Sequence, residues 1–169
     1  TTGTGSITVT GTKGGQSTSY GIYAGSQNGI VTNGTSGNVV LNADTLGWAN
    51  PGGGNYDVTS VGSITIAPLT ASTTMGVGSS AGGTLSIADT YLGYLSAPNL
   101  IFGSTSTGNV TVNTAVNFGT KNVTLISNGD VTFSGAYTST GNGALTADAY
   151  RNIMVSSAIS TANGAITLQ

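Results

Sequence analysis

The sequence predicts an all-β fold, a parallel β-helix of about eight coils with about 22 residues in each. Three observations predict it: one short strand is repeated many times, its copies recur at a fixed spacing, and glycine or asparagine precedes most copies. A repeat of this kind buries its apolar face only against another copy, so we expect successive coils to stack along one axis.

The repeated strand alternates apolar and polar residues around a central threonine. Its copies read GSITVTG from Gly5, GSITIAP from Gly62, GNVTVNT at 108–114, NGDVTFSG from Asn128 and NGAITLQ from Asn163. Successive side chains of a strand point to opposite faces, so the flanking apolar residues should lie inside and the threonines outside. The expected interior residues are Val110, Val112, Val123, Leu125, Val131, Phe133, Ile166 and Leu168. The expected outer ladder contains Thr111, Thr124, Thr132, Thr146 and Thr167.

The spacing of alternate strand copies sets the period of the coil. Val110 to Val131 spans 21 residues, Val131 to Ile153 spans 22, and Ile64 to Leu85 again spans 21. Two interleaved strand series therefore share one period. With about 4.8 Å between stacked strands, the chain should form a rod roughly 35–40 Å long.

Glycine and asparagine at the start of each copy indicate corners, because these residues tolerate the left-handed backbone of a sharp turn. We expect asparagine side chains to pair with their own copies in the next coil. Two segments, 43–57 and 88–99, break the pattern and are predicted to be irregular loops. The segment 146–158 has some helical character, but its NIMVS stretch falls on the repeat, so we predict strand there.

Composition narrows the functional classes. Gly, Ser, Thr and Asn make up 92 of 169 residues, yet 37% of the chain is apolar and alternates with polar residues, which favours a folded domain over disorder. A net charge of −2 argues against nucleic acid or an anionic membrane as a partner. Cysteine is absent, and no apolar run reaches the length of a membrane helix. The chain opens on Thr-Thr without a signal peptide, so we expect a processed product or a segment of a longer repetitive chain.

The repeats resemble the repeat region of filamentous-haemagglutinin-like exoproteins, the bacterial adhesins of two-partner secretion. The resemblance rests on the G-[SND]-[IV]-T-[VIL] strands, on NADTLG, and most closely on 139–169, with its GALTA, RNIMV and NGAITL strands. It implies a right-handed β-helix that is secreted, lies at the bacterial cell surface, and displays or spaces a binding region. It supplies no catalytic residues.

The acidic residues argue against an enzyme. Polysaccharide lyases and hydrolases need clustered carboxylates. The five aspartates, Asp44, Asp57, Asp89, Asp130 and Asp148, do not converge on the repeat. We therefore expect no catalytic residue, no metal and no cofactor. The alternative is a lone calcium ion held by Asp44 or Asp57 with loop carbonyls.

Aromatic residues in the irregular segments are the candidate ligand surface. Exposed rings can stack on sugars, and the candidates for glycan binding are Trp48, Tyr56, Tyr91 and Tyr94. The alternative is that these rings cover the core where the coils are irregular.

The expected function is a non-catalytic structural or adhesive rod of a secreted or cell-surface bacterial protein. Its expected partners are glycans or proteins of a host or neighbouring cell, with no nucleic acid and no membrane insertion. The alternative is a self-assembling fibre or surface-layer-like subunit, in which identical copies stack end to end through unpaired strand edges. A polysaccharide-degrading enzyme is a distant third.

Overall fold

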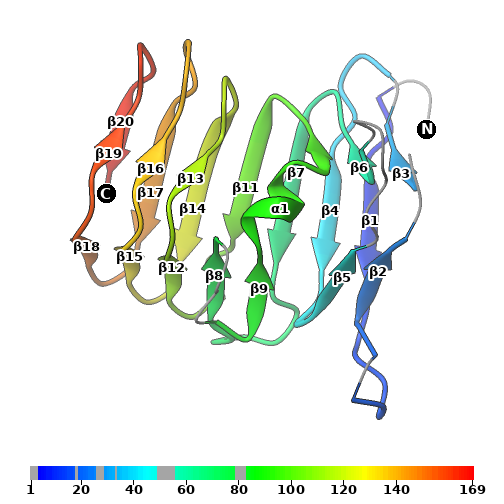
Figure 1. The fold of residues 1–169 in the computed structure, drawn as a ribbon. Coiled ribbons are helices and arrows are strands. Elements are labelled where there is room, and N and C mark those ends of the chain that lie inside the picture. The colour runs from blue at the N-terminus through cyan, green and yellow to red at the C-terminus, as the bar shows by residue number, and fades with distance from the viewer. Residues whose placement is uncertain (1–3, 18, 26–28, 33, 49–55, 79–82) are drawn as a thin grey trace.

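The computed structural model describes residues 4–17, 19–25, 29–32, 34–48, 56–78 and 83–169. Within these residues the protein is all-β, and the sole helix, α1, covers Asp89–Leu92. The strands lie one after another along the molecule, from β1 at one end to β20 at the other (Figure 1).

Seven strands form the longest sheet, which we call the long sheet. In spatial and chain order they are β1 (Ile7–Thr10), β4 (Val39–Asn42), β7 (Ser63–Ala67), β11 (Asn99–Gly103), β14 (Asn122–Ser127), β17 (Leu145–Ala149) and β20 (Ile166–Leu168). We call the chain from one of these strands to the next a coil.

Each coil leaves the long sheet, adds short strands to other sheets, and returns. The second sheet has the order β18 (Ile153–Val155), β15 (Val131–Phe133), β12 (Val110–Val112), β8 (Met75–Val77) and β9 (Leu85–Ile87). A third face carries β10 (Leu95–Ser96), β6 (Val58–Thr59) and β3 (Ile30–Val31), and separately β13 (Val116–Asn117), β16 (Tyr137–Thr138) and β19 (Ile159–Ser160). The remaining pair is β2 (Ile22–Ala24) with β5 (Leu46–Trp48).

Every strand pairing in the described residues is parallel. Parallel strands need a crossover between them, and each coil supplies one. The all-β, parallel-strand prediction is confirmed, and the arrangement is compatible with a β-helix. The right hand of the coil and its full closure stay predictions.

The register confirms the predicted period in the C-terminal half. Val110 pairs with Val131, Val131 with Ile153, and Leu145 with Ile166. The long sheet has seven strands in the described residues, and these bound six coils, fewer than the eight predicted.

The prediction that Ile64 and Leu85 occupy equivalent positions in successive coils is wrong. Ile64 lies beside Leu100, 36 residues later, and Leu85 lies beside Met75, 10 residues earlier. The coil between β7 and β11 is longer than the others because it adds both β8 and β9 to the second sheet. An equal spacing of apolar residues does not reveal which face a strand joins.

Six of the eight predicted interior residues are buried, whereas Ile166 and Leu168 of the last strand, β20, are exposed because no further coil of the described chain covers them. Val110, Val112, Val131 and Phe133 are fully buried, whereas Thr111 between the two valines is half-buried on the outside. Burying a side chain of this size contributes about 1.5–3 kcal/mol. The predicted threonines stack in register, but in two rows on different sheets and not in one ladder. Thr111 lies beside Thr132 on the second sheet; on the long sheet Thr124 lies beside Thr146, which lies beside Thr167.

Asparagine side chains connect successive coils at the corners, but the predicted pairing of an asparagine with its own copy forms between Asn99 and Asn122, whereas other corners pair asparagine with serine or aspartate. Asn38 Oδ1 accepts hydrogen bonds from the backbone N–H and hydroxyl of Ser63 at 2.8 and 3.0 Å. At the second sheet, Asn109 Oδ1 accepts the N–H of Asp130 at 3.0 Å, and Asp130 Oδ1 accepts from Asn152 Nδ2 at 2.9 Å. These bonds satisfy polar groups that a bend would otherwise leave unpaired.

The two irregular segments contain regular structure that the sequence did not reveal. Within 43–57, residues 46–48 form strand β5, while 49–55 lie outside the described residues. Within 88–99, α1 and β10 replace the predicted loop. The segment 146–158 is strand in β17 and β18, as predicted.

Candidate functional site at the short helix

The third face of the stack is interrupted beside α1. Strand β10 pairs with β6, and β13 pairs with β16, but β10 and β13 are not paired with each other. Helix α1 precedes β10 directly and stands in front of the strands at mid-length of the stack (Figure 1). Because β10 and β13 are unpaired, the surface beside α1 differs from the repetitive surface of the other coils.

Short local contacts hold α1 in place. Asp89 Oδ1 accepts the Thr90 N–H at 2.9 Å, and Leu92 is buried against the core. The Tyr94 N–H donates to the Tyr91 carbonyl at 3.0 Å, which closes the turn that leads into β10. The helix therefore presents Asp89 and Tyr91 at the surface while Leu92 anchors it.

Three of the four predicted glycan-binding residues meet at α1. The rings of Trp48 and Tyr91 are stacked with centroids 5.7 Å apart, and Tyr91 lies 5.9 Å from Tyr94 in a tilted arrangement. Aromatic pairs at these distances contribute about 0.5–1.5 kcal/mol beyond their area burial.

The structure corrects the predicted position of Trp48. It lies in strand β5 rather than in a loop, and only 8% of its surface is exposed. Tyr91 and Tyr94 are half-buried and pack against the core. The three rings thus cover the core at an irregular coil, which was the alternative weighed for them, and Trp48 offers no free face to a sugar.

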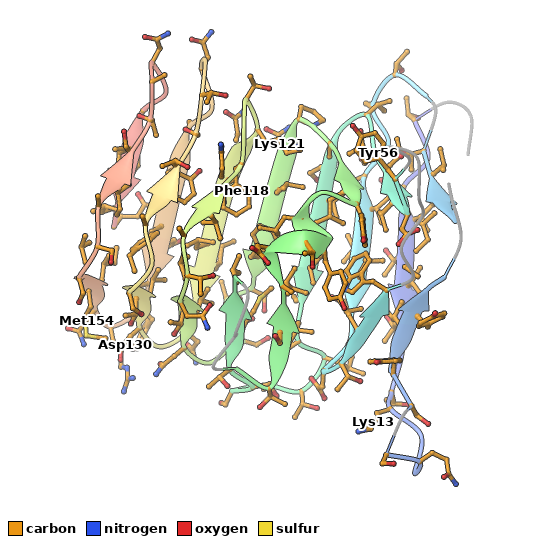
Figure 2. All side chains as sticks on the ribbon, in the orientation of Figure 1. Lys13, Tyr56, Phe118, Lys121, Asp130 and Met154 are labelled. Atoms are coloured by element: carbon orange, nitrogen blue, oxygen red, sulfur yellow. The ribbon has the colours of Figure 1, made fainter. Side chains whose placement is uncertain are left out.

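Tyr56 comes just before β6, where the Asp57 N–H donates to the Tyr94 carbonyl at 3.1 Å, so its backbone lies close to that of Tyr94 (Figure 2). It is 40% exposed and makes no ring contact with another aromatic residue of the described chain. Another exposed aromatic pair is Tyr20 and Tyr23, whose rings stack with centroids 5.9 Å apart. Three of the four predicted rings therefore contact one another, and the Tyr56 ring does not join them.

A hollow of about 380 Å³ lies on the other side of α1, which we call the helix hollow. Its lining residues are Asp89, Leu92, Gly93, Asn117, Phe118, Gly119 and Lys121. Leu92 and Phe118 form a buried apolar floor, and Asp89 and Lys121 bring opposite charges to the rim. Phe118 and Lys121 belong to the segment that follows β13 (Figure 2). The volume falls in the range of small-molecule sites.

The turn after β13 shapes this hollow. Asn117 Oδ1 accepts the Gly119 N–H at 2.9 Å, and the Lys121 N–H donates to the Phe118 carbonyl at 3.3 Å. Gly119 has φ +59°, which favours glycine. Sequence reasoning missed the hollow because Asp89 and Lys121 come from different coils and carry no shared motif.

Three of the aspartates lie in separate surroundings. Asp44 accepts the Thr70 N–H and hydroxyl at 2.9 and 2.6 Å, and Asp130 pairs with Arg151 at 2.8 Å. In the described part of the chain, no three His, Cys, Asp or Glu side chains gather as metal ligands. Asp57 is fully buried, neither of its carboxylate oxygens has a hydrogen-bond partner among the described residues, and burial raises the pKa of this carboxyl.

Comparison with known protein families, with curated proteins and with solved structures finds no match to this chain. Among the described residues, no helix has the length and apolar character needed to cross a membrane.

Proposed function

We propose that the protein is a non-catalytic structural or adhesive rod of a secreted or cell-surface bacterial protein. The observation that carries the proposal is the in-register stacking of coils: Val123, Leu145 and Ile166 occupy one interior row across three successive coils. A stack built this way holds its two ends apart, which is the task of a spacer. The resemblance to filamentous-haemagglutinin-like repeats supports the secreted, adhesive form of the proposal.

The proposed partners are glycans or proteins of a neighbouring cell. The break at α1 supports this, because the helix hollow combines an apolar floor with charged and polar rim groups. Few polar groups around an apolar floor are typical of sites that orient a small ligand.

The test is binding of the full chain to panels of glycans and of extracellular proteins. We expect Asp89→Asn and Lys121→Ala to weaken the binding of any ligand held at α1. Lys13→Ala is the matched control, since Lys13 is exposed and lies far from α1 (Figure 2). Equal binding by all variants would show that the ligand is not bound at the helix hollow. Turnover of a polysaccharide by the purified chain would overturn the non-catalytic assignment.

A second candidate function is end-to-end assembly into a fibre. Ile166 and Leu168 of β20 occupy interior register positions, beside fully buried Leu145 and Ala147, but are 44% and 45% exposed. One more coil laid on β20 would bury both side chains and pair its free edge.

Sedimentation across a concentration series, followed by electron microscopy, tests the fibre. Filaments that grow with concentration and disappear in Ile166→Asp and Leu168→Asp would support it. Thr167→Asp places the same charge on the outer face of the same strand and should leave filaments intact. A chain that stays monomeric at all concentrations would overturn the fibre.

A further inference from the structure

A second, smaller hollow lies on the outer face of the long sheet and joins residues of three coils. It measures about 130 Å³ and is lined by Thr105, Ile126, Ser127, Asn128, Asp148 and Tyr150. We call it the tyrosine hollow. At about 30 Å³ for each water molecule of the liquid, it has room for part of one small ring and not for a longer chain.

The register explains why this hollow exists. Gly103, Ile126 and Asp148 are neighbours on adjacent strands of the long sheet. Gly103 adopts φ +90° and contributes no side chain beside Ile126. Ile126 forms the floor, with the segment 104–107 on one side and Asp148 on the other.

The wall formed by 104–107 is held by its own hydrogen bonds. The Ser104 N–H donates to Thr107 Oγ1 at 2.8 Å, and the Thr107 N–H donates to the Ser104 carbonyl at 3.0 Å. The Asn128 N–H ties this wall to the next coil through the Thr107 carbonyl at 2.8 Å. A wall fixed before binding lowers the conformational entropy lost when a ligand is bound.

Tyr150 is the most exposed large hydrophobic side chain of the described residues, at 81%. Its backbone is nevertheless fixed, since the Tyr150 N–H donates to the Ser127 carbonyl at 2.9 Å. Packing a ligand on the exposed ring would bury apolar surface and release free energy.

The polar groups of the hollow are available to a ligand. Among the described residues, the side chains of Thr105, Asn128 and Asp148 have no hydrogen-bond or ion-pair partner. The nearby Arg151 is engaged with Asp130 at 2.8 Å and with Asn109 at 3.2 Å. Asp148 therefore contributes an uncompensated negative charge beside the exposed ring.

We propose that the tyrosine hollow binds one neutral pyranose unit of a surface glycan. The C–H face of the sugar packs on the Tyr150 ring, and the Asp148 carboxylate accepts hydrogen bonds from neighbouring hydroxyls. Thr105 and Asn128 supply further polar contacts at the rim. Carboxylate acceptors bind hydroxyl donors strongly, and the same negative charge disfavours acidic sugars.

This inference rests on the adhesive form of the proposed function, and it assigns a site and a ligand class to it. One ring held by one aromatic face and a few hydrogen bonds should bind with Kd of about 1 mM. The affinity of an adhesive surface would then come from many copies acting together.

The experiment is an amide-resonance NMR titration of the full chain with methyl glycosides of galactose, glucose and mannose, and with glucuronic acid and sialyllactose. We expect a neutral glycoside to shift resonances of 126–128 and 148–150, and the acidic sugars to leave them unchanged. Tyr150→Ala should weaken binding at least tenfold, and Asp148→Asn should weaken it several-fold. Tyr150→Phe should retain binding, because it keeps the ring.

Tyr23→Ala is the matched control, since Tyr23 is exposed on β2 and lies outside the hollow. No shift with any neutral glycoside, or equal binding by wild type and Tyr150→Ala, would overturn the inference. Preference for an acidic sugar would overturn the assigned ligand class. None of these results would contradict the proposed rod function, because the length of the rod is measured independently by X-ray scattering.

Discussion

Asn122 and Asn99 join two successive coils through their side chains, with Asn122 Nδ2 donating to Asn99 Oδ1 at 3.0 Å. Asn122 also uses its other end: its Oδ1 accepts the Ala144 N–H of the following coil at 3.1 Å. One amide therefore connects three coils at the same corner, and neighbouring coils are held in register there by side chains as well as by strands.

Asn122→Ala should lower the free energy of unfolding by about 1–2 kcal/mol, because both of these hydrogen bonds are lost. Urea unfolding followed by circular dichroism measures the change. Asn142→Ala is the control, since Asn142 is exposed in a turn and makes no side-chain hydrogen bond within the described residues. Equal stability of the two variants would show that the corner amides add nothing to strand pairing.

Tyr137→Phe should raise the free energy of unfolding by about 1 kcal/mol. Tyr137 is fully buried between Phe118 and Phe133, and its hydroxyl has no partner in the described part of the chain. The same burial raises the pKa of the phenol. Removing an unpaired buried hydroxyl relieves its desolvation penalty and keeps the ring packing. Tyr150→Phe, at an exposed position, should leave stability unchanged, and a less stable Tyr137→Phe would contradict the argument.

Asp57→Asn should stabilise the protein at neutral pH and not at low pH. Burial raises the pKa of the Asp57 carboxyl in the folded state, so between its ordinary and raised pKa values the folded chain binds more protons than the unfolded chain. Stability therefore falls as pH rises through that window, and the amide removes this fall. Thermal unfolding of wild type and variant at pH 3 and pH 7 measures the difference. Asp89→Asn, at an exposed carboxyl, is the comparison, and an equal effect at both pH values would contradict the prediction.

Gly103→Ala should destabilise the protein by about 3 kcal/mol or more, since it combines an unfavourable φ of +90° with a Cβ that would overlap the Ile126 carbonyl. Gly119→Ala isolates the backbone effect, because its φ is +59° but its Cβ would meet open space; about 1 kcal/mol is expected. Gly15→Ala, also in open space, should change little. Chemical denaturation ranks the three, and any other order would contradict the overlap at Gly103.

The sequence predicted the C-terminal coils well because their apolar and threonine rows repeat without insertions. It failed at the coil from β7 to β11, where Met75 and Leu85 share one sheet although only 10 residues separate them. Pattern alone identifies a strand but not the sheet that it joins. The loop predicted at Trp48 has a different cause. The Pro-Gly-Gly-Gly run, which breaks strands, begins only three residues after it.

The candidate sites were harder to predict, because each is assembled from separate coils. Asp89 and Lys121 approach one hollow only because β10 and β13 are unpaired. Tyr150 did carry a signal: it stands at a corner where the preceding coil has Asn128, a small polar residue that suits a turn. The contrast between asparagine in one coil and a large aromatic ring in the next could have indicated Tyr150 as a candidate ligand-binding residue.

The paired insertion of β8 and β9 also has a geometric consequence. Between β7 and β11 the long sheet advances by one strand spacing, while the second sheet gains two strands. With about 4.8 Å for each strand, one side of the stack is longer by a single spacing at this level. We expect this coil to act as a wedge that curves the stack away from its longer side. A longer array with such wedges at intervals would follow an arc or a superhelix, and their number would set its curvature.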